Sequence, residues 1–218
     1  IVKVSQGRLG EDLKKGVMVR SNSFGGKTRF ASIPAFVQLD NGDYAMTRRQ
    51  CTREYKIQPI ERWVRRELLG LKPRQRIPAD VTVTHYMGFS VDEPKRAANA
   101  KNRFKQIRWG EVEFPLWFEN SWRTRAAWVR YLENRVPHTV PRSACTFCPF
   151  RNNASWRELR ETDPEGWQRA IRIDEAIRSG SSEAEAGMDR PMFIHRSCVP
   201  LSEAKIDDTC GQLTLLEE

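Results

Sequence analysis

Two residues separate Cys145 from Cys148 in this 218-residue sequence. Their type and spacing most clearly allow metal binding or thiol chemistry. Two thiolates at this spacing can bind one metal, and the proline that follows stiffens the turn that holds them. Cys51 lies far upstream, while Cys198 and Cys210 are candidates for a fourth ligand. The spacing predicts a metal or iron–sulfur site closed across the fold, with one ligand from the first half of the chain.

The composition predicts a soluble globular protein with one core, or one core and a small appendage. Hydrophobic residues make up 39% of the sequence, and no apolar run approaches the ~20 residues needed to span a bilayer. We therefore expect a cytoplasmic protein without a membrane partner. The five cysteines are odd in number and unevenly spaced. This argues against a secreted disulfide framework and for reduced thiols that bind metal or react.

Basic residues are concentrated in two stretches of a chain whose net charge is +9. From Thr47 to Arg76 there are ten basic and three acidic residues, and from Lys95 to Arg108 there are six basic residues and no acidic one. This density predicts a polyanion nearby, either nucleic acid or the phosphates of a nucleotide. A solvated basic face without a special purpose is the alternative. The candidate nucleic-acid-binding residues are Arg48, Arg49, Arg62, Arg65 and Arg66.

Two patterns predict the elements that flank Cys51. Asn41-Gly42 between the apolar runs 36–39 and 44–46 predicts a β-hairpin that leads the chain to this cysteine. Apolar residues recur at helical spacing from 59 to 70, with a proline in the first turn and a glycine at the end. We expect a helix there with its arginines turned outward.

Other patterns indicate alternating strands and helices. A β-rich run over 81–87 predicts a buried strand, and a basic, poorly periodic stretch follows it. Further elements are expected over 1–4 and 112–116 as strands, and over 124–134, 155–161 and 164–178 as helices. Strands separated by helices predict an α/β fold with a mostly parallel sheet, in which ligands bind beyond the carboxyl ends of the strands. Because the first strand begins in mid-fold, we expect a segment before Ile1.

Several of these segments together resemble a known family. The run from Cys51 to Ile60 resembles the cysteine, lysine and proline segment of the phosphoadenosine-phosphosulfate (PAPS) reductase-like family of adenine nucleotide α-hydrolases. The loop from Gly88 to Arg96, the segments 115–116 and 128–132, and the run from Cys145 to Pro149 follow in the family's order. The resemblance covers most of residues 1–178. It is closest to the branch of the bacterial DNA phosphorothioation sulfurtransferase and of uncharacterised phage and bacterial proteins.

The resemblance implies a Rossmann-like sheet flanked by helices. It places an α/β nucleotide-binding-like domain over 1–118 and a helical, cysteine-containing part over 119–218. The family's pyrophosphate-binding loop, Ser-Gly-Gly followed by Ser or Thr, is not found after the first strand, so we expect it upstream of Ile1. Ser23 to Thr28 contains two glycines and could replace it, but a flexible glycine turn is the favoured interpretation. Ser90 and Pro94 stand where the family often has arginine and serine.

Nucleotide chemistry in this family assigns roles to four residues. Lys56 and Arg96 are the expected phosphate contacts, and Asp92 and Glu93 are the expected catalytic acids, which could hold Mg²⁺ or orient a nucleotide hydroxyl. Cleavage at an α-phosphate of ATP or a related nucleotide needs charge neutralisation more than covalent work. Capping of the next segment and pairing with Lys95 or Arg96 is the structural alternative for the two acids.

For the metal, the resemblance implies a [4Fe–4S] cluster held by Cys51, Cys145, Cys148 and either Cys198 or Cys210. The alternative is a zinc ion held by Cys145, Cys148, Cys198 and His195, which would leave Cys51 free. We favour iron–sulfur over zinc. A ligand beyond the end of the chain and thiols without metal are left open.

Two classes of function follow from these expectations. The first is adenine-nucleotide-dependent sulfur transfer or reduction, in the modification of nucleic acid (DNA or tRNA), with a sulfur donor protein as a further partner. The second is a zinc-stabilised nucleic-acid-binding or accessory protein without nucleotide chemistry. A true sulfonucleotide reductase of sulfate assimilation is less favoured, because the usual C-terminal catalytic cysteine motif is not found.

Overall fold

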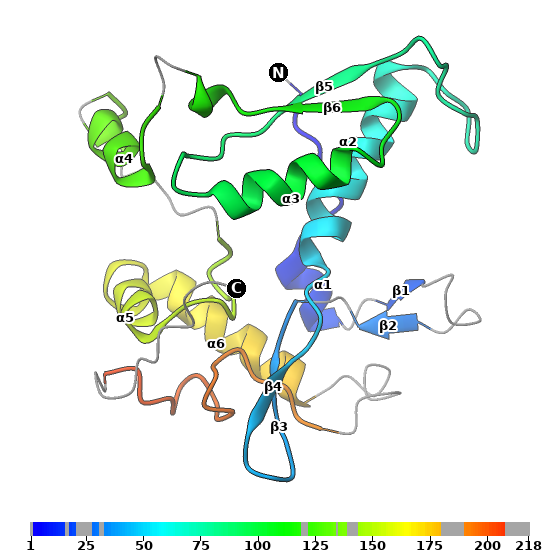
Figure 1. Ribbon diagram of the computed structural model, residues 1–218. Helices are drawn as coiled ribbons and strands as arrows, with labels where there is room; N and C mark the ends of the chain where they lie inside the picture. Colours follow the sequence, from blue (N-terminus) through cyan, green and yellow to red (C-terminus); the bar gives the residue numbers. More distant parts are fainter. Residues whose placement is uncertain are drawn as a thin grey trace. The chain divides into compact units, whose positions relative to one another are not determined.

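A computed structural model describes residues 2–15, 18–20, 28–30, 33–118, 122–133, 135–138, 144–179 and 190–207. These residues form a mixed α/β structure of helices and small two-stranded sheets (Figure 1). By its contacts the chain divides into two compact units: unit 1 contains Ile1–Val64 and Ala144–Glu218, and unit 2 contains Arg65–Ser143. The sequence-based boundary at residue 118 stays a prediction, because contacts alone do not tell which parts fold independently.

Most of the helical elements belong to unit 1. Its elements are α1 (Leu9–Lys15), β1 (Met18–Arg20), β2 (Thr28–Phe30), β3 (Phe36–Gln38), β4 (Tyr44–Met46), η2 (Arg53–Ile57), α2 (Gln58–Trp63), α5 (Asn153–Thr162) and α6 (Pro164–Ser179). The elements of unit 2 are β5 (Val83–Tyr86), α3 (Pro94–Phe104), β6 (Gly110–Glu113), η4 (Pro115–Trp117) and α4 (Arg125–Glu133). A further helical segment, η3 (Val64–Leu68), begins at the boundary between the units.

The core of unit 1 is built around α6. Both α1 and α5 pack against this helix, and Trp156, Ile173 and Ile194 are completely buried. The same cluster contains side chains from segments far apart in the sequence, including Leu13, Ile33, Phe147, Leu201 and Ile206. Burying side chains of this size contributes about 1.5–3 kcal/mol each, so the cluster holds the N-terminal part and the segment 190–207 against the two helices.

Asp174 fixes the segment 190–207 to α6 from inside the core. Its side chain is 1% exposed and accepts hydrogen bonds from the backbone amides of Ile194 at 2.8 Å and Leu201 at 3.0 Å. Arg178, one turn further along α6, forms an ion pair with it at 3.1 Å. Burial raises the pKa of Asp174, and the two amides and Arg178 act against that effect. A buried carboxylate is tolerated here because each oxygen has a donor.

The predicted hairpin before Cys51 is confirmed. β3 and β4 pair antiparallel with Phe36 opposite Met46, and Gly42 adopts a positive φ of 85° in the loop between them. The left-handed conformation favours glycine at that position. The backbone of Phe36 also exchanges two hydrogen bonds with Phe193, so the hairpin is tied to the segment that Asp174 anchors.

Unit 2 contains a βαβ arrangement. β5 and β6 pair in parallel, with Val83 opposite Gly110, and α3 lies between them in the chain and packs on β6 (Figure 1). The strand predicted as buried is only half-buried: residues along β5 alternate between partly buried and exposed. One reason is the size of this sheet, because a two-stranded sheet with a helix packed on it leaves its other face uncovered.

Three further expectations differ from the structure. Residues 2–8 form no strand and precede α1 without a regular element. The stretch 95–108, poorly periodic in sequence, contains α3, whose start carries Pro94 at a first-turn position and whose buried face is limited to Ala97 and Phe104. Two of the three described strand pairs are antiparallel, so a mostly parallel sheet is not confirmed.

The predicted helices in the second half of the chain are confirmed as α4, α5 and α6. Asn152 caps α5 by accepting from the Ser155 amide at 2.9 Å, and Asp163 accepts from the Gly166 amide at 2.8 Å at the start of α6. No helix among the described residues is long and apolar enough to cross a membrane.

Replacing Asp174 should destabilise unit 1. Asp174→Ala removes the acceptor for two buried amides, and unsatisfied buried groups of this kind cost about 1–3 kcal/mol each. We expect a fall of about 2–4 kcal/mol in the free energy of unfolding, measured by urea denaturation. Gln168→Ala, on the exposed side of the same helix, should change it by less than about 0.5 kcal/mol. Equal effects of the two variants would contradict the anchoring role.

Candidate functional site

The Cys145–Cys148 loop consists of two consecutive tight turns. The amide of Cys148 donates to the carbonyl of Cys145 at 3.1 Å, and the amide of Arg151 donates to the carbonyl of Cys148 at 3.2 Å. Arg151 also reaches the Cys145 carbonyl at 3.5 Å and lies over the ring of Trp156 at 5.4 Å. The two cysteines therefore sit on a short loop that is braced from its C-terminal side.

Phe147, between the two cysteines, anchors this loop in the core of unit 1. Its side chain is 6% exposed and belongs to the main hydrophobic cluster. Gly10 of α1 lies against it: a Cβ added at Gly10 would stand 3.3 Å from the Phe147 ring and 3.7 Å from Ile173. The close approach of α1 fixes the ring, while Cys145 stays exposed and Cys148 half-buried.

Cys51 and Lys56 belong to the same unit as the Cys145–Cys148 loop. Burial raises the pKa of the Cys145 thiol, the charges of Cys148 and Cys51 raise it further, and the charge of Lys56 lowers it. Coulombic effects of this kind require proximity. Cys51 packs at the edge of the core, and its neighbour Arg49 lies 5.5 Å from the centre of the Phe150 ring. Three of the predicted metal ligands and one predicted phosphate contact therefore belong to unit 1.

The donor set fits a soft metal, although the side chains are not in ligating positions. The charges of Cys51 and Cys148 oppose the ionisation of Cys145, and a bound cation reverses this effect because it stabilises each thiolate. Among the described residues, no three His, Cys, Asp or Glu side chains already form a metal-binding group.

Of the two predicted cysteine candidates for the fourth ligand, Cys198 lies within the described residues. Cys198 is buried, and burial alone raises the pKa of its thiol. It adopts a positive φ of 52°. Cys210 lies outside the described residues.

His195, the ligand of the zinc alternative, has both ring nitrogens occupied in the described structure. Nδ1 lies 2.7 Å from the Ser197 hydroxyl and Nε2 lies 3.2 Å from Asn153 Oδ1. Its side chain is 4% exposed. A zinc ion at this position would have to replace one of these hydrogen bonds.

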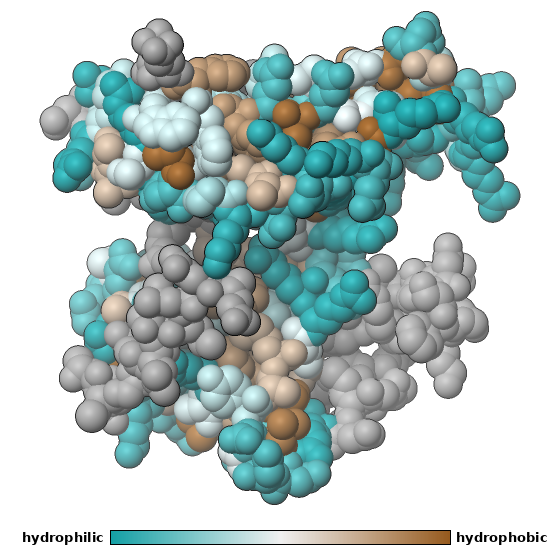
Figure 2. Space-filling model, viewed as in Figure 1, coloured by the Kyte–Doolittle hydropathy of each residue, from teal (hydrophilic) through white to brown (hydrophobic). Residues whose placement is uncertain are grey.

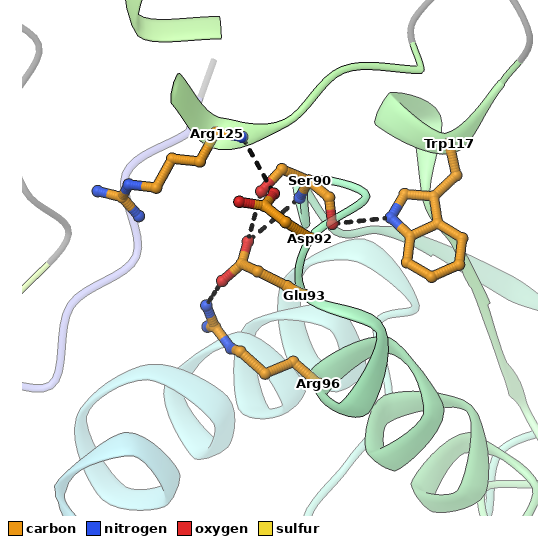
Figure 3. Close-up of polar contacts among 6 residues, drawn as sticks. All are labelled: Ser90, Asp92, Glu93, Arg96, Trp117 and Arg125. Carbon is orange, nitrogen blue, oxygen red and sulfur yellow. Dashed lines mark hydrogen bonds and ion pairs between the residues drawn. The ribbon is translucent and has the colours of Figure 1, made fainter. Parts of the chain in front are cut away.

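Asp92 and Glu93 form a hydrogen-bonded network in unit 2 (Figure 3). One Glu93 oxygen accepts from the amide and the hydroxyl of Ser90, at 3.1 and 3.0 Å, and the other pairs with Arg96. Asp92 accepts from the amide of Arg125, at the first residue of α4, at 3.0 Å. Trp117 donates to the Ser90 carbonyl at 3.1 Å. Glu93 thus makes the pairing contact of the structural alternative, but neither side chain caps α3, and Asp92 bonds the start of α4 instead. A catalytic role for the two acids stays a prediction.

The electrostatics of the two acids follow from these contacts. Hydrogen bonding from the Ser90 side chain is the main cause of the lowered pKa of Asp92, with the Arg125 amide contributing. For Glu93, burial alone would raise the pKa, but the donors from Ser90 and Arg96 outweigh it and the pKa is lowered. The Ser90 hydroxyl has one proton and serves one carboxylate at a time. Both acids are therefore ionised at neutral pH.

The predicted phosphate contacts have different surroundings. Lys56 is exposed beside the thiols in unit 1. Arg96 belongs to unit 2, where it pairs with Glu93 and lies 4.5 Å from the centre of the Phe89 ring. The run from Ser23 to Thr28 cannot be assessed as a phosphate loop, because residues 21–27 lie outside the described residues.

The predicted nucleic-acid-binding arginines are distributed over both units. Arg48, Arg49 and Arg62 belong to unit 1, and Arg65 and Arg66 to unit 2. Arg49 bonds the Thr52 hydroxyl at 2.7 Å and Arg62 bonds Gln6 at 2.9 Å. The face viewed in Figure 2 is largely hydrophilic, with apolar residues in small groups.

Sequence reasoning missed a pocket of about 350 Å³ in unit 2. Arg65 lines it together with Arg74, Arg76, Arg108 and Trp109. The density of basic residues in both stretches indicated an anion-binding site. That these residues line one pocket, however, depends on the pairing of β5 and β6. Similarly, the Ser-x-x-Glu spacing at residues 90–93 is a capping-box signal that indicates the contact between Ser90 and Glu93.

Comparisons with known proteins identify no relative of this chain. No family model, curated protein or solved structure matches the chain. The resemblance to the PAPS reductase-like family therefore rests on the motifs and their order.

The burial of His195 predicts a pH dependence of stability. Burial, with a contribution from Arg196, lowers its pKa to about 4, from 6.5. Between these values the folded state binds fewer protons than the unfolded state, so stability falls as the pH drops from about 6.5 toward 4. At about pH 5 the loss should reach up to ~2 kcal/mol relative to pH 7. This loss of stability is measured by urea denaturation of the wild type and of His195→Gln at both pH values.

The variant provides the internal control, because all other titrating groups are shared. His195→Gln should lose less stability between about pH 7 and pH 5 than the wild type does. The same loss in both proteins would show that His195 is not held neutral by the fold.

Proposed function

We propose that this chain is a PAPS reductase-like enzyme that transfers or reduces sulfur with the help of an adenine nucleotide and an iron–sulfur cluster, in the modification of nucleic acid. The observation that carries the proposal is that Cys51 packs against the hydrophobic cluster that contains Phe147 of the Cys145–Cys148 loop. The order of the family's motifs along the sequence supports it. In this proposal β5, α3 and β6 are one repeat of a Rossmann-like sheet.

Cys51, Cys145 and Cys148 would hold the cluster, with Cys198 or Cys210 as the fourth ligand. Thiolates are the usual ligands of such clusters, and the loop offers two of them on turns that Phe147 fixes. A bound cluster of this kind would carry or activate sulfur. Lys56 would offset part of the negative charge of the ligating thiolates, since it already lowers the pKa of Cys145.

The nucleotide half of the proposal depends on charge neutralisation. Lys56 and Arg96 would contact phosphate groups, and Asp92 and Glu93 would hold Mg²⁺ or a nucleotide hydroxyl. Both acids are ionised at neutral pH, as a magnesium ligand must be.

A zinc-stabilised nucleic-acid-binding or accessory protein is the second candidate. The observation that favours it is the network of Figure 3, in which Glu93 and Arg96 already satisfy each other and Asp92 caps α4. Residues with such structural partners are retained for folding even when nucleotide chemistry is lost. In this candidate the thiols bind zinc and have only a structural role.

Metal analysis tests the cluster. Anaerobically purified wild type should be brown and contain about four irons and four sulfides per chain. Cys51→Ser, Cys145→Ser and Cys148→Ser should each lose most of the iron and bleach the visible absorption, because each removes a thiolate ligand. Iron, sulfide and zinc are measured on the same samples.

The two remaining thiols serve as matched controls for one another. One of the variants Cys198→Ser and Cys210→Ser should lose iron and thereby identify the fourth ligand. The other variant should keep its iron. A colourless wild type with one zinc would favour the second candidate. Full iron content in Cys51→Ser would contradict the proposed site.

Release of pyrophosphate from ATP tests the nucleotide half. Lys56→Ala should lower the rate by about tenfold or more, because it removes a positive charge from the phosphates. Lys14→Ala, another exposed lysine of unit 1, should leave the rate unchanged. Equal rates in wild type and Lys56→Ala would contradict a role of Lys56 in the nucleotide site.

A further inference from the structure

The arginine pocket of unit 2 has the charge of an anion-binding site. We define it by Arg65, Arg74, Arg76, Arg108 and Trp109, and no acidic residue lines it. Within the described part of the chain, no carboxylate forms an ion pair with any of these four arginines. Four like charges gathered without counter-charges repel one another, so a bound anion would stabilise this arrangement.

The protein backbone holds two of the four guanidinium groups in place. Arg65 donates to the carbonyl of Gln75, and Arg108 reaches the carbonyl of Ile77 at 3.5 Å. Ile77 is buried, which fixes this loop. Guanidinium groups positioned in advance lose less freedom when they bind a phosphate.

The other two arginines extend from the loop into solvent. Arg74 and Arg76 are exposed, and Arg74 has a positive φ of 66°. The turn is closed by two hydrogen bonds between Lys72 and Gln75, at 2.9 and 3.1 Å. A non-glycine residue in the left-handed region costs about 1 kcal/mol or more, and such residues cluster at functional sites.

Trp109 gives the pocket an aromatic wall. It is half-buried, and its ring centre lies 5.8 Å from that of His85. Its carbonyl accepts from the Val83 amide at 2.8 Å, so the residue is fixed to the first residue of β5. An aromatic ring beside guanidinium groups is the combination with which proteins bind single strands, where bases stack and phosphates pair with arginine.

We propose that the arginine pocket binds one nucleotide unit of a single-stranded nucleic acid, with its phosphate on the arginines and its base on Trp109. The volume of about 350 Å³ is at the small end of the range for ligand pockets. The pocket is open to solvent, so the rest of a strand can lie outside it. The inference rests on the proposed function only in its choice of nucleic acid as partner.

The test measures binding of a labelled single-stranded oligothymidylate to the full, anaerobically purified chain by fluorescence anisotropy. The double variant Arg74→Ala/Arg76→Ala should bind at least about tenfold more weakly, and its salt dependence should be less steep by about 0.7 for each phosphate that it no longer neutralises. Trp109→Leu should weaken binding by about fivefold or more, because the base can no longer stack. Arg172→Ala, an exposed arginine of α6, is the charge-matched control and should bind within about twofold of wild type.

Three results would overturn the inference. The first is that the double variant binds the strand with the same affinity as Arg172→Ala does, while thermal unfolding shows that both variants are folded. The second is that the matching duplex binds as tightly as the strand. The third is that AMP or inorganic phosphate competes at the same concentration as the unlabelled strand, which would identify a small anion as the ligand.

Metal content measured on the same samples separates this inference from the proposed function. Strand binding through the pocket in a protein without iron would contradict the proposed function alone. A protein with a full cluster whose pocket variants bind like wild type would contradict the pocket alone.

Discussion

The burial of Phe147 is the constraint on which the candidate site depends. Its ring occupies the core of unit 1 against α1 and near Ile173 of α6, so the two cysteines on either side of it cannot move far from the core surface. The same core holds Cys51 at its edge. Packing therefore positions Cys51 and the Cys145–Cys148 loop at the surface of one core, and the repulsion among charged thiolates is what a metal would relieve.

The second constraint is the anchoring of the segment 190–207. Asp174 holds it from α6, and α5 holds its far end through the two hydrogen bonds of Arg160 to Asp207 at 2.6 and 3.0 Å. This segment completes the core that buries Phe147. A carboxylate buried at this point favours one arrangement of the segment, because any other would leave two amides without an acceptor.

Local signals in the sequence predicted the local structure. Asn41-Gly42 indicated the hairpin, and apolar residues at helical spacing indicated α4, α5 and α6, because these patterns act within a few residues. The helix α3 was missed since its buried face is small, and the strand expected over 1–4 has no partner among the described residues. Residue type predicted a site shared by Cys51 and Cys145, which stays a prediction. The arginine pocket was not predicted, because its members come from segments that only tertiary pairing brings together.

X-ray absorption at the iron and zinc edges of anaerobically purified protein would test the central claim most directly. The account predicts an iron edge whose neighbours are sulfur atoms and other iron atoms, lost when Cys51 is replaced by serine. Zinc bound to sulfur with no iron signal, or iron coordinated only by oxygen and nitrogen, would contradict it.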